Sequence, residues 1–520
     1  MKNALEDGIV SGMRLRTAGA ALAVGVVMLA AVTTAQSAKA QNLTTLYSFA
    51  GTDGANPQAP LVQTTNGNLY GTTLNGGTST NGTDGTVFEI TPGGTLTPLH
   101  SFCLQSGCPD GDHPPAGLVQ ATNGNLYGTT EDGGGGCCGT VFKMTPGGKL
   151  TTLDSFGAED GSGPYPTAGL VEATDGDLYG TTVGGGANGA GAVFRMTPGG
   201  LLTTIYSFCS KSNSQTNCVD GFSPAAGLIQ ATNGDLYGTT TYGGTIGGGT
   251  VGAGGTAFKI TLGGTLTTLH SFCSKNNAHT NCLDGYTPLA ALVQATNGDF
   301  YGTTQSGGAN NAGTVFRIAP SGKLTTLYSF CSQSACADGA EGGNAAQALI
   351  QATDGNLYGT TADGGATGGG ANTNGYGTIF KITPGGELTT LYTFCIEGGC
   401  KDGGQPYGGL VQDTNGNFYG TTYTGGTNSP SAGTVFSLSV GLSQFVETLP
   451  TSGKVGAAVK ILGTDLTDAT GVTFNGTTAA FTVVSSSEIT TTVPAGATSG
   501  RVVVTMPGGI LTGNLSFRVR

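Results

Sequence analysis

Tryptophan is absent from this sequence, and charged side chains are scarce. Charged residues make up 10% of the 520 residues, and there are four histidines. Glycine, by contrast, accounts for 96 residues. Such a composition excludes long helices as the main element and is typical of many short strands joined by tight turns. Because the chain is longer than one hydrophobic core usually supports, we expect several domains or a repeat array.

Long apolar runs are also lacking, with one exception near the N-terminus. Two arginines precede the apolar run at residues 18–32, and Ala38-Lys39-Ala40 has the small residues of a cleavage site. We therefore predict that residues 1–40 are a signal peptide, with Met1 or Met13 as the true start. The run is shorter than the roughly 20 residues of a membrane span. No similar run follows, so no membrane span is expected after signal removal.

Basic residues are too few to hold a polyanion. Without the predicted signal peptide, 15 basic and 29 acidic residues remain, a net charge of −14. Nucleic-acid binding depends on clustered lysine and arginine, so a nucleic-acid partner is not expected. Extracellular glycans and proteins remain as the expected partners.

A phrase of Leu or Phe followed by Tyr-Gly-Thr-Thr occurs seven times, at intervals of 52 to 64 residues. Each unit divides into four strand-like runs, which in the second unit are residues 118–122, 125–130, 139–145 and 149–156. Asn-Gly or Asp-Gly separates the first two runs in every unit, and this pair is a strong hairpin signal because both residues adopt positive φ. Each unit is therefore predicted to be an antiparallel four-stranded meander, as in a propeller blade.

Loop lengths predict which end of the units varies. The turn between the first and second runs and the turn between the third and fourth have constant length. The segment after Tyr-Gly-Thr-Thr instead varies from 8 to 15 residues, and the loop between units from 10 to 18. Alternate connections of a meander emerge at the same end. Both variable loops should therefore lie on one face, where recognition is expected.

The first strand after the signal peptide offers a closure for the array. Residues 43–49 have the sequence of a fourth run with no unit before it, and the seventh unit ends after its third run, Gly433 to Val440. Pairing them would complete the seventh sheet and remove two exposed edges. A β-helix would gain nothing from this arrangement. We therefore predict an all-β fold in which residues 42–440 form a closed seven-bladed β-propeller with four-stranded antiparallel blades.

Ten of the twelve cysteines lie in pairs, each within one loop between units. The pairs are Cys103 with Cys108, Cys209 with Cys218, Cys273 with Cys282, Cys331 with Cys336, and Cys395 with Cys400. In an exported protein such spacing indicates local disulfides. Zinc is the alternative, but no histidine recurs beside the thiols. The adjacent Cys137 and Cys138 could bond each other, exchange with Cys103 or Cys108, or coordinate a metal.

No sequence motif for catalysis is present, neither a Gly-x-Ser-x-Gly elbow nor a His-Glu-x-x-His helix nor a P-loop, and no catalytic residue is assigned. His100 and His270 replace the tyrosine of the fourth run and are interpreted as structural. His113 and His279 lie in loops without a paired nucleophile. The tyrosines of the repeat are expected in the packing between units, with their hydroxyls reaching partners.

An Asp-Gly pair recurs in every loop between units. Its aspartates, the candidates for the binding face, are Asp53, Asp110, Asp160, Asp220, Asp284, Asp338 and Asp402. One interpretation is turn formation, because Asp bonds its own backbone. The other is a ring of carboxylates that binds a cation, with calcium possible as the cofactor.

After Val440 the repeat ends and short strands follow at residues 459–464, 472–476, 489–494 and 500–505. They indicate a small β-sandwich over residues 445–520. The phrases Pro-Thr-Ser-Gly, Ile-Leu-Gly-Thr-Asp-Leu and Val-Pro in this segment resemble the IPT/TIG Ig-like domain.

The repeat itself resembles the GloVer tandem-repeat family of exported bacterial proteins. The resemblance is carried by Gly-Leu-Val-Gln-Ala-Thr, Leu-Tyr-Gly-Thr-Thr, Gly-Thr-Val-Phe and Leu-Thr-Thr-Leu-Tyr-Ser-Phe. It implies a secreted or cell-surface bacterial protein and carries no assigned activity.

The sequence therefore predicts a non-enzymatic extracellular binding or adhesion scaffold that recognises a glycan or protein through its variable-loop face. The alternative is a secreted carbohydrate-active enzyme, a polysaccharide lyase or glycosidase. Its acidic pair would come from Asp110, Asp132, Glu159, Asp160 and Glu341. A catalytic site should break the repeat, with carboxylates converging within about 5 to 10 Å. A symmetric ring of aspartates favours binding or a structural role.

Overall fold

The computed structural model describes residues 42–79, 82–135, 138–157, 165–211, 218–245, 254–274, 282–333, 336–338, 348–365, 375–396, 399–428 and 431–520. The predicted signal peptide lies outside the described residues, as do Cys137, Glu159, Asp160, His279 and Glu341. Within the described part, no helix has the length and apolar character needed to cross a membrane.

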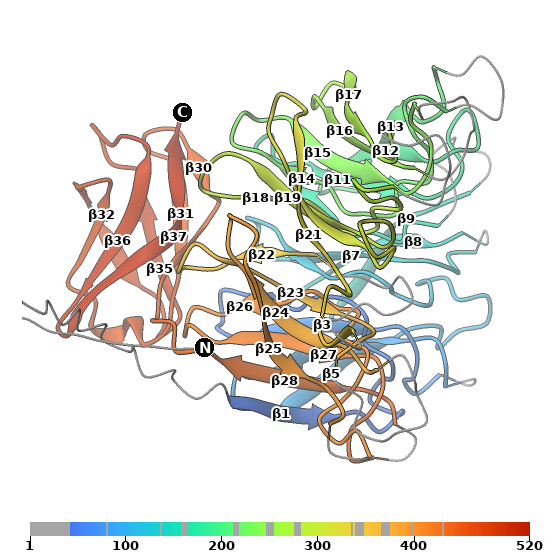
Figure 1. Ribbon diagram of the computed structural model, residues 1–520. Coiled ribbons are helices and arrows are strands. Elements are labelled where there is room, and N and C mark those ends of the chain that lie inside the picture. Colours follow the sequence, from blue (N-terminus) through green and yellow to red (C-terminus); the bar gives the residue numbers. More distant parts are fainter. Residues whose placement is uncertain are drawn as a thin grey trace, which may run out of the picture. The chain divides into compact units, whose positions relative to one another are not determined.

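Seven four-stranded antiparallel sheets are formed by the described residues of the repeat (Figure 1). The first sheet contains β2 (Val62–Gln63), β3 (Leu69–Thr73), β4 (Thr86–Ile90) and β5 (Leu96–Ser101). The second contains β6 (Val119–Gln120), β7 (Leu126–Thr130), β8 (Thr140–Met144) and β9 (Leu150–Ser155), and the third contains β10 (Val171–Glu172), β11 (Leu178–Thr182), β12 (Ala192–Met196) and β13 (Leu202–Ser207). The fourth contains β14 (Ile229–Gln230), β15 (Leu236–Thr240), β16 (Thr256–Ile260) and β17 (Leu266–Ser271), and the fifth contains β18 (Val293–Gln294), β19 (Phe300–Thr304), β20 (Thr314–Ile318) and β21 (Leu324–Ser329). The sixth contains β22 (Ile350–Gln351), β23 (Leu357–Thr361), β24 (Thr378–Ile382) and β25 (Leu388–Thr393), and the seventh contains β26 (Val411–Gln412), β27 (Phe418–Thr422), β28 (Thr434–Ser439) and β1 (Asn42–Ser48).

The predicted division of each unit into four strands is confirmed, with one difference. The first strand of each unit has two residues, whereas the sequence predicted five in the second unit. The strand ends early because the Asn-Gly turn begins at once. The N–H of Ala121 already donates to the carbonyl of Asn125 across this turn at 2.9 Å.

The Tyr-Gly-Thr-Thr strand is buried in every sheet. All seven of its tyrosines are at most 2% exposed: Tyr70, Tyr127, Tyr179, Tyr237, Tyr301, Tyr358 and Tyr419. Their hydroxyls bond the turn residue four positions earlier, as Tyr179 does with Asp175 at 2.8 Å. The glycine is needed because a Cβ on Gly71 would lie 2.5 Å from the ring of Phe88. The predicted packing of these tyrosines is confirmed.

A phenylalanine that follows each outer strand contacts the next sheet along the chain. Phe102 packs on Phe142 with ring centroids 5.4 Å apart. Equivalent pairs have centroid distances of 5.1 to 5.5 Å and are Phe156 with Phe194, Phe208 with Phe258, Phe272 with Phe316, Phe330 with Phe380, and Phe394 with Phe436. The pair of Phe49 and Phe88, at 5.3 Å, joins the seventh sheet to the first.

Hydrogen bonds in the turns between first and second strands follow the same path. Gln120 Oε1 accepts the backbone N–H of Thr65 in the preceding sheet at 3.0 Å. The equivalent bonds are Thr122 to Glu172, Thr174 to Gln230, Thr232 to Gln294, Thr296 to Gln351, and Thr353 to Gln412. Thr414 then donates to Gln63 of the first sheet at 3.0 Å. Contacts therefore lead from each sheet to the next and from the seventh back to the first.

The predicted pairing between the first strand and the end of the repeat is confirmed. Strand β1 runs antiparallel to β28, with Asn42 opposite Ser439. The N–H of Phe49 donates to the carbonyl of Gly433 at 3.0 Å. The seventh sheet is therefore built from both ends of the repeat region.

Two further sheets follow the repeat and enclose a separate core. One contains β29 (Glu447–Leu449), β31 (Ala458–Leu462), β35 (Glu488–Thr492) and β34 (Phe481–Val483). The other contains β30 (Ser452–Gly453), β37 (Gly509–Val519), β36 (Gly500–Met506), β32 (Gly471–Phe474) and β33 (Thr477–Ala479), and a 3-10 turn spans Leu466–Asp468. Ile461, Phe474, Ile489 and Phe517 are buried in their common core. The four strands predicted here are all present.

The C-terminal sheets contact turns of constant length in the repeat. Ser487 Oγ donates to the carbonyl of Thr65 at 2.9 Å, and the hydroxyls of Thr414 and Thr464 lie 2.9 Å apart. Both repeat residues lie in turns between first and second strands. The contacts therefore fall at the end of the sheets that lacks the variable loops.

Asp413 is a buried carboxyl in the last of these turns. It is 1% exposed. One carboxylate oxygen accepts the N–H of Asn415 at 2.8 Å, and the other has no hydrogen-bond partner. The same position holds Thr64 in the first unit and alanine in the next five. Burial raises the pKa of Asp413 to about 6, against the lowering effect of the Asn415 N–H.

We predict that Asp413→Ala stabilises the protein at neutral pH. Because the pKa is higher in the folded protein than the value of about 4 expected when unfolded, the folded state binds this proton more tightly. Stability from this group is present below pH 4 and is lost as the pH rises through 6. Denaturant unfolding should show a gain of about 1 to 3 kcal/mol at pH 7.5 and a much smaller one at pH 4. The control is Asp354→Asn, at an exposed turn aspartate. A variant less stable than wild type at pH 7.5 contradicts the prediction.

Candidate functional site

Single-residue β-bridges join the two variable loops of a unit. Among the described residues they pair Ala55 with Asn75, Asp112 with Asp132, Phe222 with Tyr242, Tyr286 with Ser306, and Gly404 with Thr424. The first residue of each pair follows Asp-Gly, and the second follows Tyr-Gly-Thr-Thr. The bridges bring both variable loops to one end of the sheets, as the loop lengths predict.

Six residues that stand directly before a proline in the loops between units have a left-handed backbone, and five of them follow a bridge residue. The φ angles are 51° to 69° for Asn56, His113, Tyr165, Ser223, Thr287 and Gln405. Left-handed backbone is uncommon for residues other than glycine. In the second unit the His113 N–H donates to the Asp84 carbonyl at 2.9 Å, and the His113 carbonyl accepts the N–H of Glu131 at 3.0 Å. Equivalent bonds hold Ser223 and Thr287. We call the bridge residues and these six residues the bridge surface: its backbone is constant and its side chains differ.

The recurring loop aspartates bond the outer strand and the start of the loop. Asp220 is fully buried and accepts the Tyr206 hydroxyl at 2.6 Å and the Ser210 N–H at 3.0 Å. Asp338 bonds Tyr328 and Ser332 in the same way. The other contacts are Asp53 with Tyr47, and Asp402 with Tyr392 and the N–H of Cys395. Asp160 lies outside the described residues. Each described aspartate thus anchors its loop.

Two histidines take the place of tyrosine in this anchor. The sequence predicted their place in the fourth run and a structural role, but not their bond to the loop aspartate. His100 Nε2 lies 2.8 Å from Asp110, and His270 Nε2 lies 3.1 Å from Asp284. Burial raises the pKa of Asp284. Hydrogen bonds from His270 and from the N–H groups of Asp284 and Ser274 lower the pKa of Asp284 by more than burial raises it. The net effect is a lowered pKa.

The predicted local disulfides are present in five loops of the described part. They join Cys103 to Cys108, Cys209 to Cys218, Cys273 to Cys282, Cys331 to Cys336, and Cys395 to Cys400, with Cα atoms 4.1 to 4.5 Å apart. Cys138 is also disulfide-bonded, while Cys137 lies outside the described residues. These bonds and the aspartate anchors fix the base of the variable loops.

Cavities lie beside the anchored loops. They measure about 350 Å³ beside His100 and Asp110, about 340 Å³ beside His270 and Ser274, and about 530 Å³ beside Tyr47 and Asp402. All three occupy the same place in the repeat. They are therefore a property of the repeat and not of one unit.

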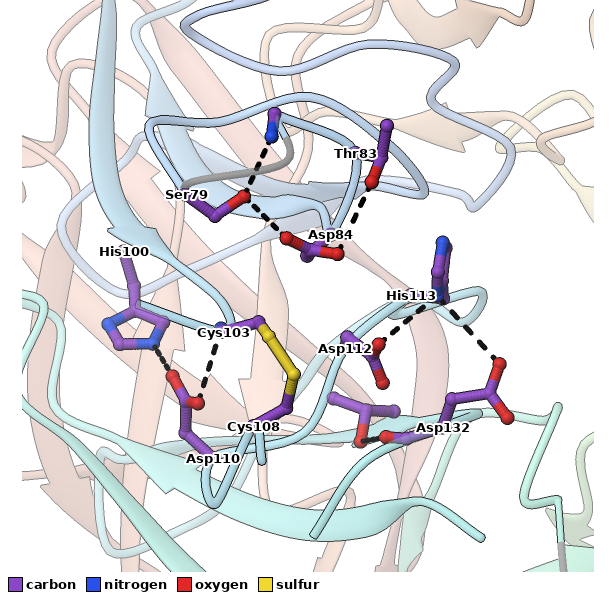
Figure 2. Close-up of a disulfide and its surroundings, with 12 residues drawn as sticks. Ser79, Thr83, Asp84, His100, Cys103, Cys108, Asp110, Asp112, His113 and Asp132 are labelled. Atoms are coloured by element: carbon purple, nitrogen blue, oxygen red, sulfur yellow. Dashed lines mark hydrogen bonds and ion pairs between the residues drawn. A yellow bond between two sulfur atoms is a disulfide. The ribbon is translucent and has the colours of Figure 1, made fainter. Parts of the chain in front are cut away.

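The second unit departs from the repeat on the bridge surface. Asp112, His113 and Asp132 converge there (Figure 2). His113 Nδ1 lies 3.6 Å from an oxygen of Asp112 and 3.8 Å from one of Asp132. Each of the three side chains offers one ligand atom, an oxygen from each aspartate and a ring nitrogen from His113. These three atoms lie within 4.8 Å of one another. A group with three possible metal ligands thus lies among the variable loops.

Two more acids surround this group. Asp84 is 4% exposed and bonds the hydroxyls of Ser79 and Thr83. The pKa of Asp112 is raised by its burial and by Asp132, Asp84 and Asp110, against the lowering effect of His113. Burial raises the pKa of Glu131, as does Asp132. Negative charge is thus concentrated around one imidazole.

The acids considered for catalysis do not form one group in the described residues. Asp110 is bonded to His100, and Asp132 belongs to the group around His113. Glu159, Asp160 and Glu341 lie outside the described residues. The sequence interpretation missed the partnership of Asp112 and His113 with Asp132. Alignment of the seven units shows that these positions differ between units, but it does not show that Asp112 and Asp132 lie side by side.

The sheets and their short connections define an all-β repeat protein. A model described as Gloeobacter/Verrucomicrobia repeat matches residues 25–252, 138–371 and 251–489. The chain belongs to this family.

Solved structures similar to the chain include enzymes and a binding protein. A catalytically inactive virginiamycin B lyase from Staphylococcus aureus with quinupristin is 14% identical over 77% of this chain and 99% of its own, with a TM-score of 0.47. A fungal alcohol oxidase of the AA5 family in complex with copper is 12% identical over 92% and 98%, with a TM-score of 0.48. An auxiliary nutrient binding protein from Bacteroides thetaiotaomicron is 11% identical over 77% and 76%, with a TM-score of 0.38. None of the curated proteins matches the chain.

We predict that Asp284→Asn destabilises the protein in a pH-dependent way. The Asp284 carboxylate is buried and accepts hydrogen bonds, and its lowered pKa means that the charged form stabilises the fold above pH 4. This contribution is lost as the pH falls through the folded pKa. Denaturant unfolding should show a loss of about 1 to 3 kcal/mol at pH 7 that shrinks below pH 4. The matched control is again Asp354→Asn. Equal losses at pH 7 and pH 3 are the contrary result.

Proposed function

We propose that the chain is an exported protein in which residues 42–440 form a closed seven-bladed β-propeller and residues 445–520 an IPT/TIG Ig-like domain. It acts outside the cell, or at its surface, as a non-enzymatic binding scaffold. Its variable-loop face recognises a glycan, with a protein ligand as the other candidate.

Two circuits of contacts support a closed ring. The phenylalanine pairs pass through all seven sheets and return to the first. So do the bonds between a turn threonine and a glutamine, or in one case Glu172, of the neighbouring sheet. Pairing of β1 with β28 gives the seventh sheet its fourth strand. The two C-terminal sheets with one core support the Ig-like domain. Disulfides in the loops support an oxidising location outside the cytosol.

The observation that carries the binding function is the bridge surface. One backbone arrangement recurs there, and the side chains on it range from acidic to aromatic. Surfaces with a fixed scaffold and variable loops are typical sites of recognition. The constant turns at the other end contact the C-terminal sheets through Thr65 and Thr414. Recognition therefore falls to the variable-loop face.

Exposed aromatic rings on the bridge surface favour a glycan. Tyr165 is 41% exposed and Tyr242 is 39% exposed. The ring of Phe222 lies 5.2 Å from that of Tyr242, centroid to centroid. A tyrosine offers an apolar face and a hydroxyl together, and amide and hydroxyl side chains lie at neighbouring bridge positions. This mixture suits a ligand with many hydroxyls.

The enzyme alternative has one observation in its favour. The group of Asp112, His113 and Asp132 breaks the repeat, as a catalytic site should. Asp112 is partly buried beside other acids, and its pKa is raised. Glycoside cleavage would need a proton donor of this kind. The experiment below therefore also looks for release of reducing or unsaturated sugar ends.

We predict that Tyr165→Ala combined with Tyr242→Ala lowers glycan affinity at least tenfold. The purified full-length mature chain is screened on a glycan array, and the bound glycan is titrated against wild type and variant. The matched control is Leu201→Ala, which removes an exposed apolar side chain of 70% exposure from a constant turn. Unchanged affinity in the double variant, or no binding to any glycan, contradicts glycan recognition at this surface. Capture of a protein ligand whose binding the double variant abolishes would select the other candidate, and sugar-end release would select the enzyme.

A further inference from the structure

We propose that Asp112, His113 and Asp132 bind one divalent transition-metal cation, with zinc the ion that fits best. The site lies on the bridge surface of the second unit, apart from the recurring loop aspartates. Binding of the ion needs only these three side chains, so the proposal does not depend on which ligand the rest of the face recognises.

The distances within the group suit a shared cation better than direct hydrogen bonds. His113 Nδ1 lies 3.6 and 3.8 Å from the carboxylates of Asp112 and Asp132. A hydrogen bond at such lengths is not formed. Ligand atoms about 2.0 to 2.2 Å from one tetrahedral zinc ion stand roughly 3.3 to 3.6 Å apart. The three ligand atoms lie within 4.8 Å of one another, so the side chains would move inward to reach this spacing.

One of the ligand atoms, Nδ1 of His113, is buried and lacks a hydrogen-bond partner. The Asp112 oxygen that faces it is Oδ2, and the other oxygen of Asp112, Oδ1, is likewise buried without a partner. A buried polar atom without a partner is costly and is rare in native proteins. The side chains as wholes are only partly buried, at 31% and 16% exposure, so a cation could reach them from solvent. Coordination would give the His113 nitrogen the partner that it lacks.

The backbone holds the ligands before any ion arrives. The N–H of Asp112 donates to the carbonyl of Asp132 at 3.0 Å, and the reciprocal bond is 3.3 Å long. The N–H of His113 is fixed by the Asp84 carbonyl at 2.9 Å. The two aspartates are thereby held opposite each other, with the histidine next to one of them. Little ordering remains to be done when the ion binds.

Surplus negative charge surrounds the group. Asp84 lies close enough to raise the pKa of Asp112. Glu131 lies close enough to Asp132 and His113 for both to affect its pKa. Four carboxyl groups thus share one imidazole. Among the ion pairs of the described residues, none joins a lysine or arginine to any of these four acids. A divalent cation would offset the repulsion between their carboxylates.

The other units show that the scaffold does not require these side chains. The first unit has Ala55, Asn56 and Asn75 at the same three positions, with the same bridge and the same left-handed residue. The fifth unit has Tyr286, Thr287 and Ser306. The fold is therefore served by residues that bind no metal. The acids and the histidine of the second unit need another explanation, and metal binding supplies it.

The donor set selects the kind of ion. Imidazole is a poor ligand for calcium, which prefers oxygen alone, whereas one imidazole with two carboxylates suits zinc and its neighbours. The sulfur atoms of Cys103 and Cys108 lie near Asp112 but are joined in a disulfide and are not thiolates. Three protein ligands leave one position of a tetrahedral ion open. An oxygen of the recognised ligand could fill it, and only this last step rests on the proposed function.

The test is a titration of zinc chloride into the chelator-treated mature protein, with disulfides intact, by calorimetry. We expect one zinc ion per chain. His113→Asn and Asp132→Asn should each weaken its binding at least tenfold, because each removes a ligand. These residues stand at the same positions in the first unit, as Asn56 and Asn75, so the variants should fold. Their melting temperatures without zinc are compared with that of wild type, and one well-folded variant suffices.

Two controls separate this site from others on the chain. His100→Tyr restores the residue usual at its position, and Asp354→Asn removes an exposed acid elsewhere; both should bind zinc as wild type does. The proposal is overturned if no saturable site exists, if the binding survives in the folded His113→Asn variant, or if calcium binds more tightly than zinc. Glycan binding is measured separately on the zinc-free protein. Absence of zinc binding with glycan binding intact contradicts the metal site alone. Absence of glycan binding with zinc binding intact contradicts the proposed function alone.

Discussion

The packing of one phenylalanine against the next sheet is the contact on which the repeat region depends. A single four-stranded sheet cannot bury both of its faces, so each unit is stable only through its neighbours. Phe102 and its equivalents provide this contact at six of the seven junctions between sheets. The seventh junction requires Phe49, which comes from the other end of the repeat and is fully buried on Phe88. Without strand β1, the junction of the first and seventh sheets would lose its phenylalanine contact and keep the bond from Thr414 to Gln63.

This constraint explains why the variable loops can differ so widely. The sheets, the constant turns and the aspartate anchors hold the backbone at the base of each loop, and a disulfide is added where the loop is longer. Residues on the bridge surface therefore keep their positions whatever their side chains are. The structure separates the residues that maintain the fold from those that are free to meet a ligand. That separation is what allows one unit to carry Asp112 and His113 where another carries Ala55 and Asn56.

Much of the fold could be predicted because it is encoded locally. Turn residues mark the strands, constant spacing marks the repeat, and paired cysteines mark the disulfides. The partner of residues 43–49 could be found because the seventh unit lacked one strand. The bridge surface could not be found in this way. Asp112 and Asp132 lie on different loops, and a bridge of one residue leaves no periodic pattern in the sequence. The burial of Asp413 was also missed, although its turn position is buried in the other units too, as Thr64 and Ala121 show at 1% exposure each.

The central claim is that β1 is a full member of the seventh sheet, and amide hydrogen exchange under native conditions tests it most directly. The N–H of Phe49 donates to Gly433, and the N–H of Phe156 donates to Gly139 at the same place in the second sheet. Exchange at both amides should be slowed to a similar degree, because both need the sheet to open. Exchange of the Phe49 amide at the rate of an unstructured chain, with Phe156 protected, would contradict the account.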